Sequence, residues 1–135
     1  MRFSYRDISF DDLRGDLVTD YLVAVEADLQ IVDGERTVYE EPSFPVVELA
    51  RALQAWSGAP VRDDFVFDSL SSDVPGLVTV AREGDLWVVF SATEPASRSA
   101  PLPAPEIDAC VRQFIDEVAA ELRDRGIDPG RVLGD

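Results

Sequence analysis

The sequence predicts an α+β fold in a single domain spanning residues 1–135. Two pairs of apolar segments, each pair joined by a short glycine turn, predict antiparallel hairpins. Two longer segments carry apolar residues at helical spacing. In chain order the elements are strand, strand, strand, helix, strand, strand, strand, helix. We therefore expect a mainly antiparallel sheet of five to six strands with two amphipathic helices on one face.

The first three strands are expected near the N-terminus. Residues 2–9 alternate polar and apolar side chains, with a bulge expected after Arg6. In residues 20–32 apolar side chains recur at every second position, which is typical of a half-buried strand. An Asp-Gly pair at 33–34 then predicts a hairpin turn. The return strand is short and is expected to end at Pro42.

The middle of the chain is expected to form one helix and three further strands. Residues 44–58 have apolar side chains at helical spacing and end in glycine, which predicts a helix. A strand is expected in residues 63–70, and a second hairpin in residues 76–92 turns at Gly84. Because both hairpin strands are apolar on both faces, we expect them at the centre of the sheet.

A proline-rich internal loop, residues 95–105, is expected to cross to the other side of the sheet. The last helix follows in residues 105–126, and Cys110 lies within its apolar stripe. Such a setting is typical of a buried, inert thiol. Trp56 and Trp87 are expected in the core between helices and sheet.

Composition limits the partners of the chain. The net charge is -15, all twelve cations are arginine, and histidine is absent. This charge opposes binding to nucleic acid and to anionic membranes, and it favours a basic protein partner. A single cysteine permits no internal disulfide, and no apolar run resembles a signal peptide or a membrane span. We expect a cytoplasmic protein.

The same composition predicts that the chain is not an enzyme and holds no cofactor or metal. Without histidine and lysine, the commonest general base and the Schiff-base lysine are missing. Nucleotide-binding glycine motifs and the hydrolase nucleophile motif are absent from the sequence. The acids of residues 63–73 do not have calcium-loop spacing. A hydrolase that uses a pair of carboxylates is the least favoured alternative.

Acidic residues concentrate in the first half of the chain. Between Asp7 and Glu48 there are twelve acids and two arginines. They indicate either an electrostatic docking surface or a solvated sheet edge that charge protects from aggregation. A salt-loving host is a third explanation of the acidity. The candidate partner-binding residues are Asp11, Asp12, Asp16, Asp20, Glu26, Asp28, Glu40 and Glu41.

The layout of residues 20–125 resembles a known group of proteins. The segments "VVELARALQAW", "FVFDSL", "GLVTVAREGDLWVVF" and "IDACVRQFIDEVAAEL" follow one another in an acidic, histidine-free chain. This pattern resembles the small immunity proteins of bacterial polymorphic-toxin systems, including the WapI-like group. The resemblance implies a non-catalytic protein that binds and neutralises a cognate toxin domain, often a basic nuclease. The alternative is a non-catalytic accessory or regulatory protein-binding domain whose acidity reflects its host.

Overall fold

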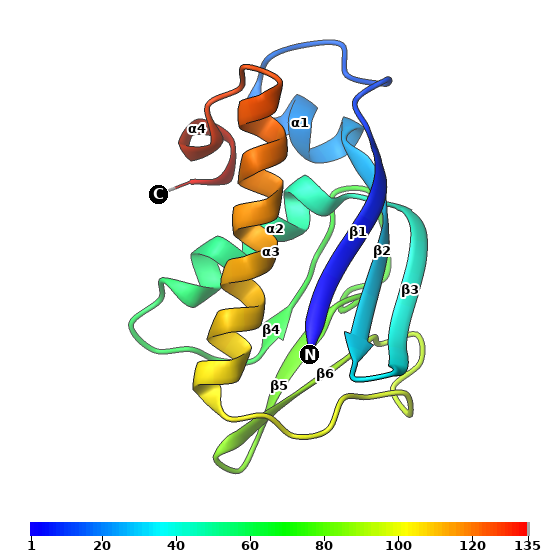
Figure 1. The fold of residues 1–135 in the computed structure, drawn as a ribbon, viewed down its shortest axis with the longest axis vertical. Coiled ribbons are helices and arrows are strands. Elements are labelled where there is room, and N and C mark those ends of the chain that lie inside the picture. Colours follow the sequence, from blue (N-terminus) through cyan, green and yellow to red (C-terminus); the bar gives the residue numbers. More distant parts are fainter. Residues whose placement is uncertain (135) are drawn as a thin grey trace.

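The computed structural model describes residues 1–134 and has the predicted α+β architecture (Figure 1). Its six strands form two three-stranded antiparallel sheets, which we call sheet A (β1-β2-β3) and sheet B (β4-β5-β6). The strands are β1 (Arg2–Ser9), β2 (Glu26–Asp33), β3 (Arg36–Phe44), β4 (Phe65–Val66), β5 (Thr79–Glu83) and β6 (Leu86–Phe90). The helices are α1 (Val18–Ala24), α2 (Val46–Ser57), α3 (Ala104–Asp124) and α4 (Pro129–Leu133). The element order differs from the predicted one by two additional short helices, α1 and α4.

The expectation of one continuous sheet is wrong, because a segment of the proline-rich loop separates the two sheets. Residues 97–102 run between β3 and β6 (Figure 1). The Ser97 hydroxyl donates to the carbonyl of Val38 in β3 at 2.8 Å. The Ser99 N–H donates to the carbonyl of Val89 in β6 at 2.9 Å. This segment, which we call the bridging segment, therefore lies along the facing edges of both sheets before α3 begins.

Sheet A contains two irregularities. The bulge expected after Arg6 is confirmed, since the pairing of β1 with β2 shifts register between Arg6 and Ser9. β3 does not end at Pro42 as expected but continues to Phe44. Because β3 is the last strand of sheet A, a proline without an N–H costs no ladder hydrogen bond on its open side.

The second expected strand begins later than predicted, because residues 18–24 form α1. The Asp20 carboxylate accepts a hydrogen bond from the Leu17 N–H at 2.9 Å, which is the reciprocal half of a capping box. Val23, which alternation places on the buried face of a strand, is 44% exposed on the helix. From Val25 onward the alternation is confirmed, and every second residue to Ile31 is buried.

Sheet B also differs from expectation. The strand predicted in residues 63–70 contains only Phe65–Val66, because residues 67–76 form a closed loop. The Gly76 N–H donates to the carbonyl of Phe67 at 2.8 Å and brings the ends of this loop together. The hairpin at Gly84 is confirmed, but only β5 is central, and the bridging segment rather than a strand lies beside β6.

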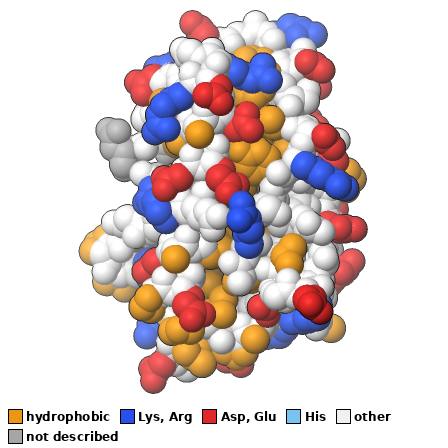
Figure 2. Space-filling view, viewed as in Figure 1, with side chains coloured by type: hydrophobic (Ala, Val, Ile, Leu, Met, Phe, Trp, Pro, Cys, Tyr) orange, Lys and Arg blue, Asp and Glu red, His pale blue; other side chains and the backbone are white. Residues whose placement is uncertain are grey.

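Helices α2 and α3 pack against each other and cover the inner side of the sheets (Figure 1). The predicted apolar stripe of α3 is buried, and its Phe114 meets Phe3 of β1 edge-on at 6.0 Å. Phe44 of β3 and Phe67 lie 5.6 Å apart and join the two sheets in one core. Acidic side chains and arginines are mixed over the helix-covered face (Figure 2). In residues 1–134 no helix combines the length and apolar character that crossing a membrane requires.

The two tryptophans meet where α2 packs on sheet B. Trp87 is buried, as predicted, whereas Trp56 is only half-buried. The two rings lie edge-on at 5.5 Å. The Trp56 indole N–H donates to the carbonyl of Asp63 at 2.8 Å, and the Arg62 guanidinium lies 4.7 Å from the Trp56 ring. Trp56 therefore ties the segment between α2 and β4 to the helix through these two contacts.

Candidate functional site

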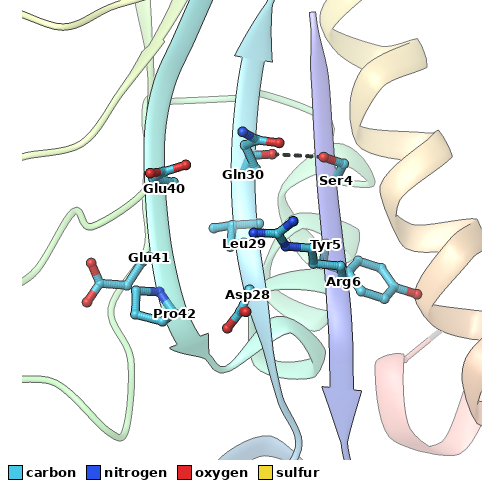
Figure 3. Close-up of a pocket in the computed structure, with 9 residues that line it drawn as sticks. All are labelled: Ser4, Tyr5, Arg6, Asp28, Leu29, Gln30, Glu40, Glu41 and Pro42. Atoms are coloured by element: carbon cyan, nitrogen blue, oxygen red, sulfur yellow. Dashed lines mark hydrogen bonds between the residues drawn. The ribbon is translucent and has the colours of Figure 1, made fainter.

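The outer face of sheet A is not covered by the helices, which pack on the other side. Alternate side chains of its strands point outward, and they face one another in register across the sheet. Arg6 pairs with Asp28, Ser4 with Gln30, and Gln30 with Glu40. They surround a shallow depression of about 240 Å³ (Figure 3). We call this surface the outer face of sheet A, and it consists of Ser4, Arg6, Glu26, Asp28, Gln30 and Glu40.

The charges of this surface are not neutralised by one another. In the described part of the chain, residues 1–134, no ion pair within 4.0 Å involves Arg6, Asp28 or Glu40. Asp28 instead accepts a hydrogen bond from the backbone N–H of Ser43 at 3.2 Å. Glu40 is exposed. The carboxylates are therefore available to cations that approach from solvent.

Both strands that flank β2 carry a left-handed residue close to Asp28. Asp7 of β1 has a φ of 57°, and Ser43 of β3 has a φ of 53°. Aspartate adopts this conformation more readily than most residues, whereas for serine it costs more free energy. The hydrogen bond from Ser43 to Asp28 holds the second of these bends. Strained backbone is often concentrated at functional sites, so these two bends support this end of sheet A as the candidate site.

Glu41 lies at the edge of sheet A rather than on its outer face. Its side chain points away from the depression (Figure 3), and the Tyr39 hydroxyl donates to it at 3.4 Å. Burial raises the pKa of Tyr39 to about 12, and the charges of Glu41 and Glu94 add to this effect. Glu94 belongs to the second half of the chain, so acids from both halves act on Tyr39 at this edge.

The remaining predicted acids lie in or next to the loop between β1 and α1. Asp11, Asp12 and Asp16 are exposed there. This loop follows Ser9, which pairs with Glu26, so it lies at the end of sheet A where β2 begins. Asp20 is not free to act in the same way, because its carboxylate caps α1. The eight predicted acids thus form a sheet group and a loop group, with Asp20 in a structural role.

Glu48 is a buried carboxylate whose role the sequence pattern did not predict. Its position in the first turn of α2 indicated only a favourable interaction with the helix dipole. In the structure it is 6% exposed. One carboxylate oxygen accepts from the Ser69 hydroxyl at 2.6 Å, and the other accepts from the Leu70 N–H at 2.8 Å. Glu48 therefore anchors the loop of residues 67–76 to α2.

Other groups with chemical potential lie outside this surface. Burial raises the pKa of the Cys110 thiol, so the thiol is protonated at neutral pH. Burial also raises the pKa of Tyr5, with a further contribution from Glu121 and Glu117. Asp64 accepts a hydrogen bond from the Arg82 N–H at 2.9 Å, near the end of β5. Within residues 1–134 no group of three or more acids, cysteines or histidines is placed to hold a metal ion.

Comparison with known proteins identifies a family. The family described as a domain of unknown function, DUF7878, matches residues 1–124. The chain belongs to this family. The DUF7878 match includes both sheets and α1 to α3, and hence all of the outer face of sheet A, whereas α4 lies beyond it. No curated protein and no solved structure gave a significant match.

Proposed function

We propose that this DUF7878 chain is a non-catalytic immunity protein that binds and neutralises a basic toxin domain. The observation that carries the proposal is the outer face of sheet A, where Glu26, Asp28 and Glu40 face solvent. Arg6 is the single cation among the residues that form this face. The resemblance to immunity proteins of polymorphic-toxin systems agrees with this reading.

The charge pattern supports both fast association and selectivity. A net charge of -15 attracts a cationic partner over distances of about 8 Å at physiological salt. Arg6 lies beside Asp28, so a matching partner presents a carboxylate among its cations. A partner with cations alone would meet Arg6 unfavourably, and this repulsion contributes to selectivity.

One observation favours the alternative, an accessory or regulatory domain whose acidity follows host composition. Acids are also exposed on α3, on the side of the molecule away from the outer face of sheet A (Figure 2). Glu106, Asp116 and Asp124 are examples. These three residues provide a control that separates position from net charge.

The test is affinity capture from the native host, followed by co-expression. The sheet variant Glu26→Gln/Asp28→Asn/Glu40→Gln and the control variant Glu106→Gln/Asp116→Asn/Asp124→Asn change the net charge equally. We expect wild type and control to retain one cationic protein that arrests growth when expressed alone, and to restore growth on co-expression. The sheet variant should lose both effects. Equal losses in both variants would favour the alternative, and a captured protein without toxicity would contradict an immunity role.

A further inference from the structure

The closed loop of residues 67–76 presents aliphatic side chains to solvent. Leu70 is 65% exposed and Val74 is 44% exposed. Val66, at the base of the loop in β4, is 53% exposed and lies beside Gly76, where an added Cβ would be 3.6 Å from it. Single exposed apolar residues are common, but here three occur within nine residues of one short segment. We call these three residues the apolar loop patch.

The loop that carries this patch is held firmly in place. Glu48 accepts hydrogen bonds from Ser69 and Leu70, and the Ser71 N–H donates to the Ser69 hydroxyl at 3.0 Å. The Gly76 N–H closes the loop by donating to the carbonyl of Phe67. The aliphatic side chains are thus exposed by a fixed backbone. A pre-organised loop loses little conformational entropy on binding, which favours a docking role.

The segment of the chain that carries the patch is acidic. Between Arg62 and Arg82 the chain has four acids, Asp63, Asp64, Asp68 and Asp73, and no cation. A second copy of the chain carries the same net charge of -15, and an anionic membrane is also negative, so both are repelled. The complementary occupant is a protein segment with apolar side chains flanked by arginine or lysine.

The base of the closed loop adjoins the end of β3. Phe44, at the end of β3, packs against Phe67 at the start of the loop. The Ala92 N–H donates to the carbonyl of Gly76 at 2.8 Å, and the charge of the neighbouring Glu94 reaches Tyr39 of β3. Segments of the second half of the chain pass beside β3 near Glu41 (Figure 3). The base of the loop and the end of β3 are therefore neighbours in the fold.

We propose that the apolar loop patch is the anchor for an amphipathic, cationic segment of the partner. This inference rests on the proposed function, and it adds the chemistry of the partner's contact region. Charges of the outer face of sheet A guide the approach, whereas burial of Leu70 and Val74 slows dissociation. Aliphatic anchors of this kind contribute affinity that salt does not screen.

The experiment uses two synthetic helical peptides with identical arginines, one with leucines and one with serines on the other face. Fluorescence anisotropy measures their binding to the full chain at low and high salt. We expect wild type to prefer the leucine peptide by about tenfold, which corresponds to about 1.4 kcal/mol. In Leu70→Ser/Val74→Ser the two peptides should bind equally. The control Leu17→Ser removes an exposed leucine outside the closed loop, at the N-terminus of α1, and should keep the preference.

The other outcomes are each decisive. A preference that persists in Leu70→Ser/Val74→Ser, or no preference in wild type, would overturn the inference while leaving electrostatic capture by sheet A in place. Failure of both peptides to bind wild type at low salt would count against the proposed function as well. Concentration-dependent dimerisation that is lost in Leu70→Ser/Val74→Ser would assign the patch to self-association, and binding to neutral vesicles would assign it to lipid. Either result would overturn the proposal.

Discussion

Sheets A and B have the same plan, a hairpin with one additional antiparallel strand, but their outer faces differ in polarity and in how far the chain covers them. Sheet A leaves its outer face to solvent with charged side chains. The outer face of sheet B is largely apolar, and the chain covers part of it with Arg98 of the bridging segment. The Arg98 guanidinium lies 4.6 Å from the centre of the Phe90 ring and 3.7 Å from the Glu83 carboxylate. Val88, on the same face of β6 as Phe90, is only 2% exposed. Sheet B therefore has apolar side chains covered on its outer face, whereas the outer face of sheet A remains charged and open to solvent, as the proposed docking role requires.

The strongest test of this division is the substitution Trp87→Ala in sheet B. Trp87 is buried between β6, Trp56 and the bridging segment, so truncation leaves a cavity. We expect the free energy of unfolding to fall by about 3–5 kcal/mol in urea denaturation. The matched change Glu40→Gln in sheet A should alter it by less than about 0.5 kcal/mol. Similar losses in the two variants would show that both sheets contribute to stability in the same way.

The next largest effect is expected from Glu48→Ala, which releases the loop beside sheet B from α2. The Ser69 hydroxyl and the Leu70 N–H lose a charged acceptor, so we expect a loss of about 2–3 kcal/mol in the free energy of unfolding. Hydrogen exchange of the Leu70 amide should become faster in the same variant. Glu41→Gln is the control with an exposed carboxylate. An unchanged exchange rate at Leu70 would show that the loop does not depend on Glu48.

A smaller effect on stability, but a clear one on binding, is expected from Glu26→Gln/Asp28→Asn in sheet A. Stability should change by less than about 1 kcal/mol, because the amide oxygen of the substituted side chain can still accept from the Ser43 N–H. Stopped-flow association with the captured partner should slow several-fold at low salt and approach the wild-type rate at high salt. The control Glu106→Gln/Asp116→Asn has the same net charge. An equal slowing in both variants would remove sheet A as the docking surface.

The smallest expected effect concerns Tyr39, at the edge where the two halves meet. Its folded pKa of about 12 exceeds the ordinary value of 10.0, so the folded state keeps a proton that the unfolded state loses. The contribution to stability is complete below pH 10 and is lost as the pH rises through about 12. Urea denaturation at increasing pH should show a shallower decline for Tyr39→Phe than for wild type. The same decline in both proteins would contradict the cause given for the shift.

Much of the fold could be predicted because its signals are local. Alternation in β2, helical spacing in α2 and α3, and glycine at positions 34 and 84 each depend on a few neighbouring residues. The segment that forms α1 was misassigned because its apolar residues also fit strand alternation, and the helix begins with an unusual leucine at its N-cap. The division into two sheets could not be predicted, because it depends on hydrogen bonds of the bridging segment to Val38 and Val89, far away in sequence.

The same distinction applies to the candidate site. Glu26, Asp28 and Glu40 share one face of sheet A, since alternation along a strand decides which side chains face solvent. The roles of Asp20 and Glu48 could not be predicted, because they depend on hydrogen-bond donors that alternation does not indicate. Asp20 accepts from the N-cap residue of its own helix, and Glu48 accepts from a loop that lies 22 residues away in sequence. An acid in the first turn of a helix has the same sequence signal whether it is solvated or buried.

The position of the bridging segment in the chain has a consequence for protein synthesis. The edge of β3 receives its cover from Ser97, which emerges from the ribosome long after β3 itself. During that interval the edge is an unpaired strand, which other chains can extend by hydrogen bonding. Glu40, Glu41 and Pro42 occupy this strand, and charge and proline both discourage such pairing. Glu40 and Glu41, which we assign to partner binding, therefore also oppose aggregation of the nascent chain until the bridging segment has been synthesised.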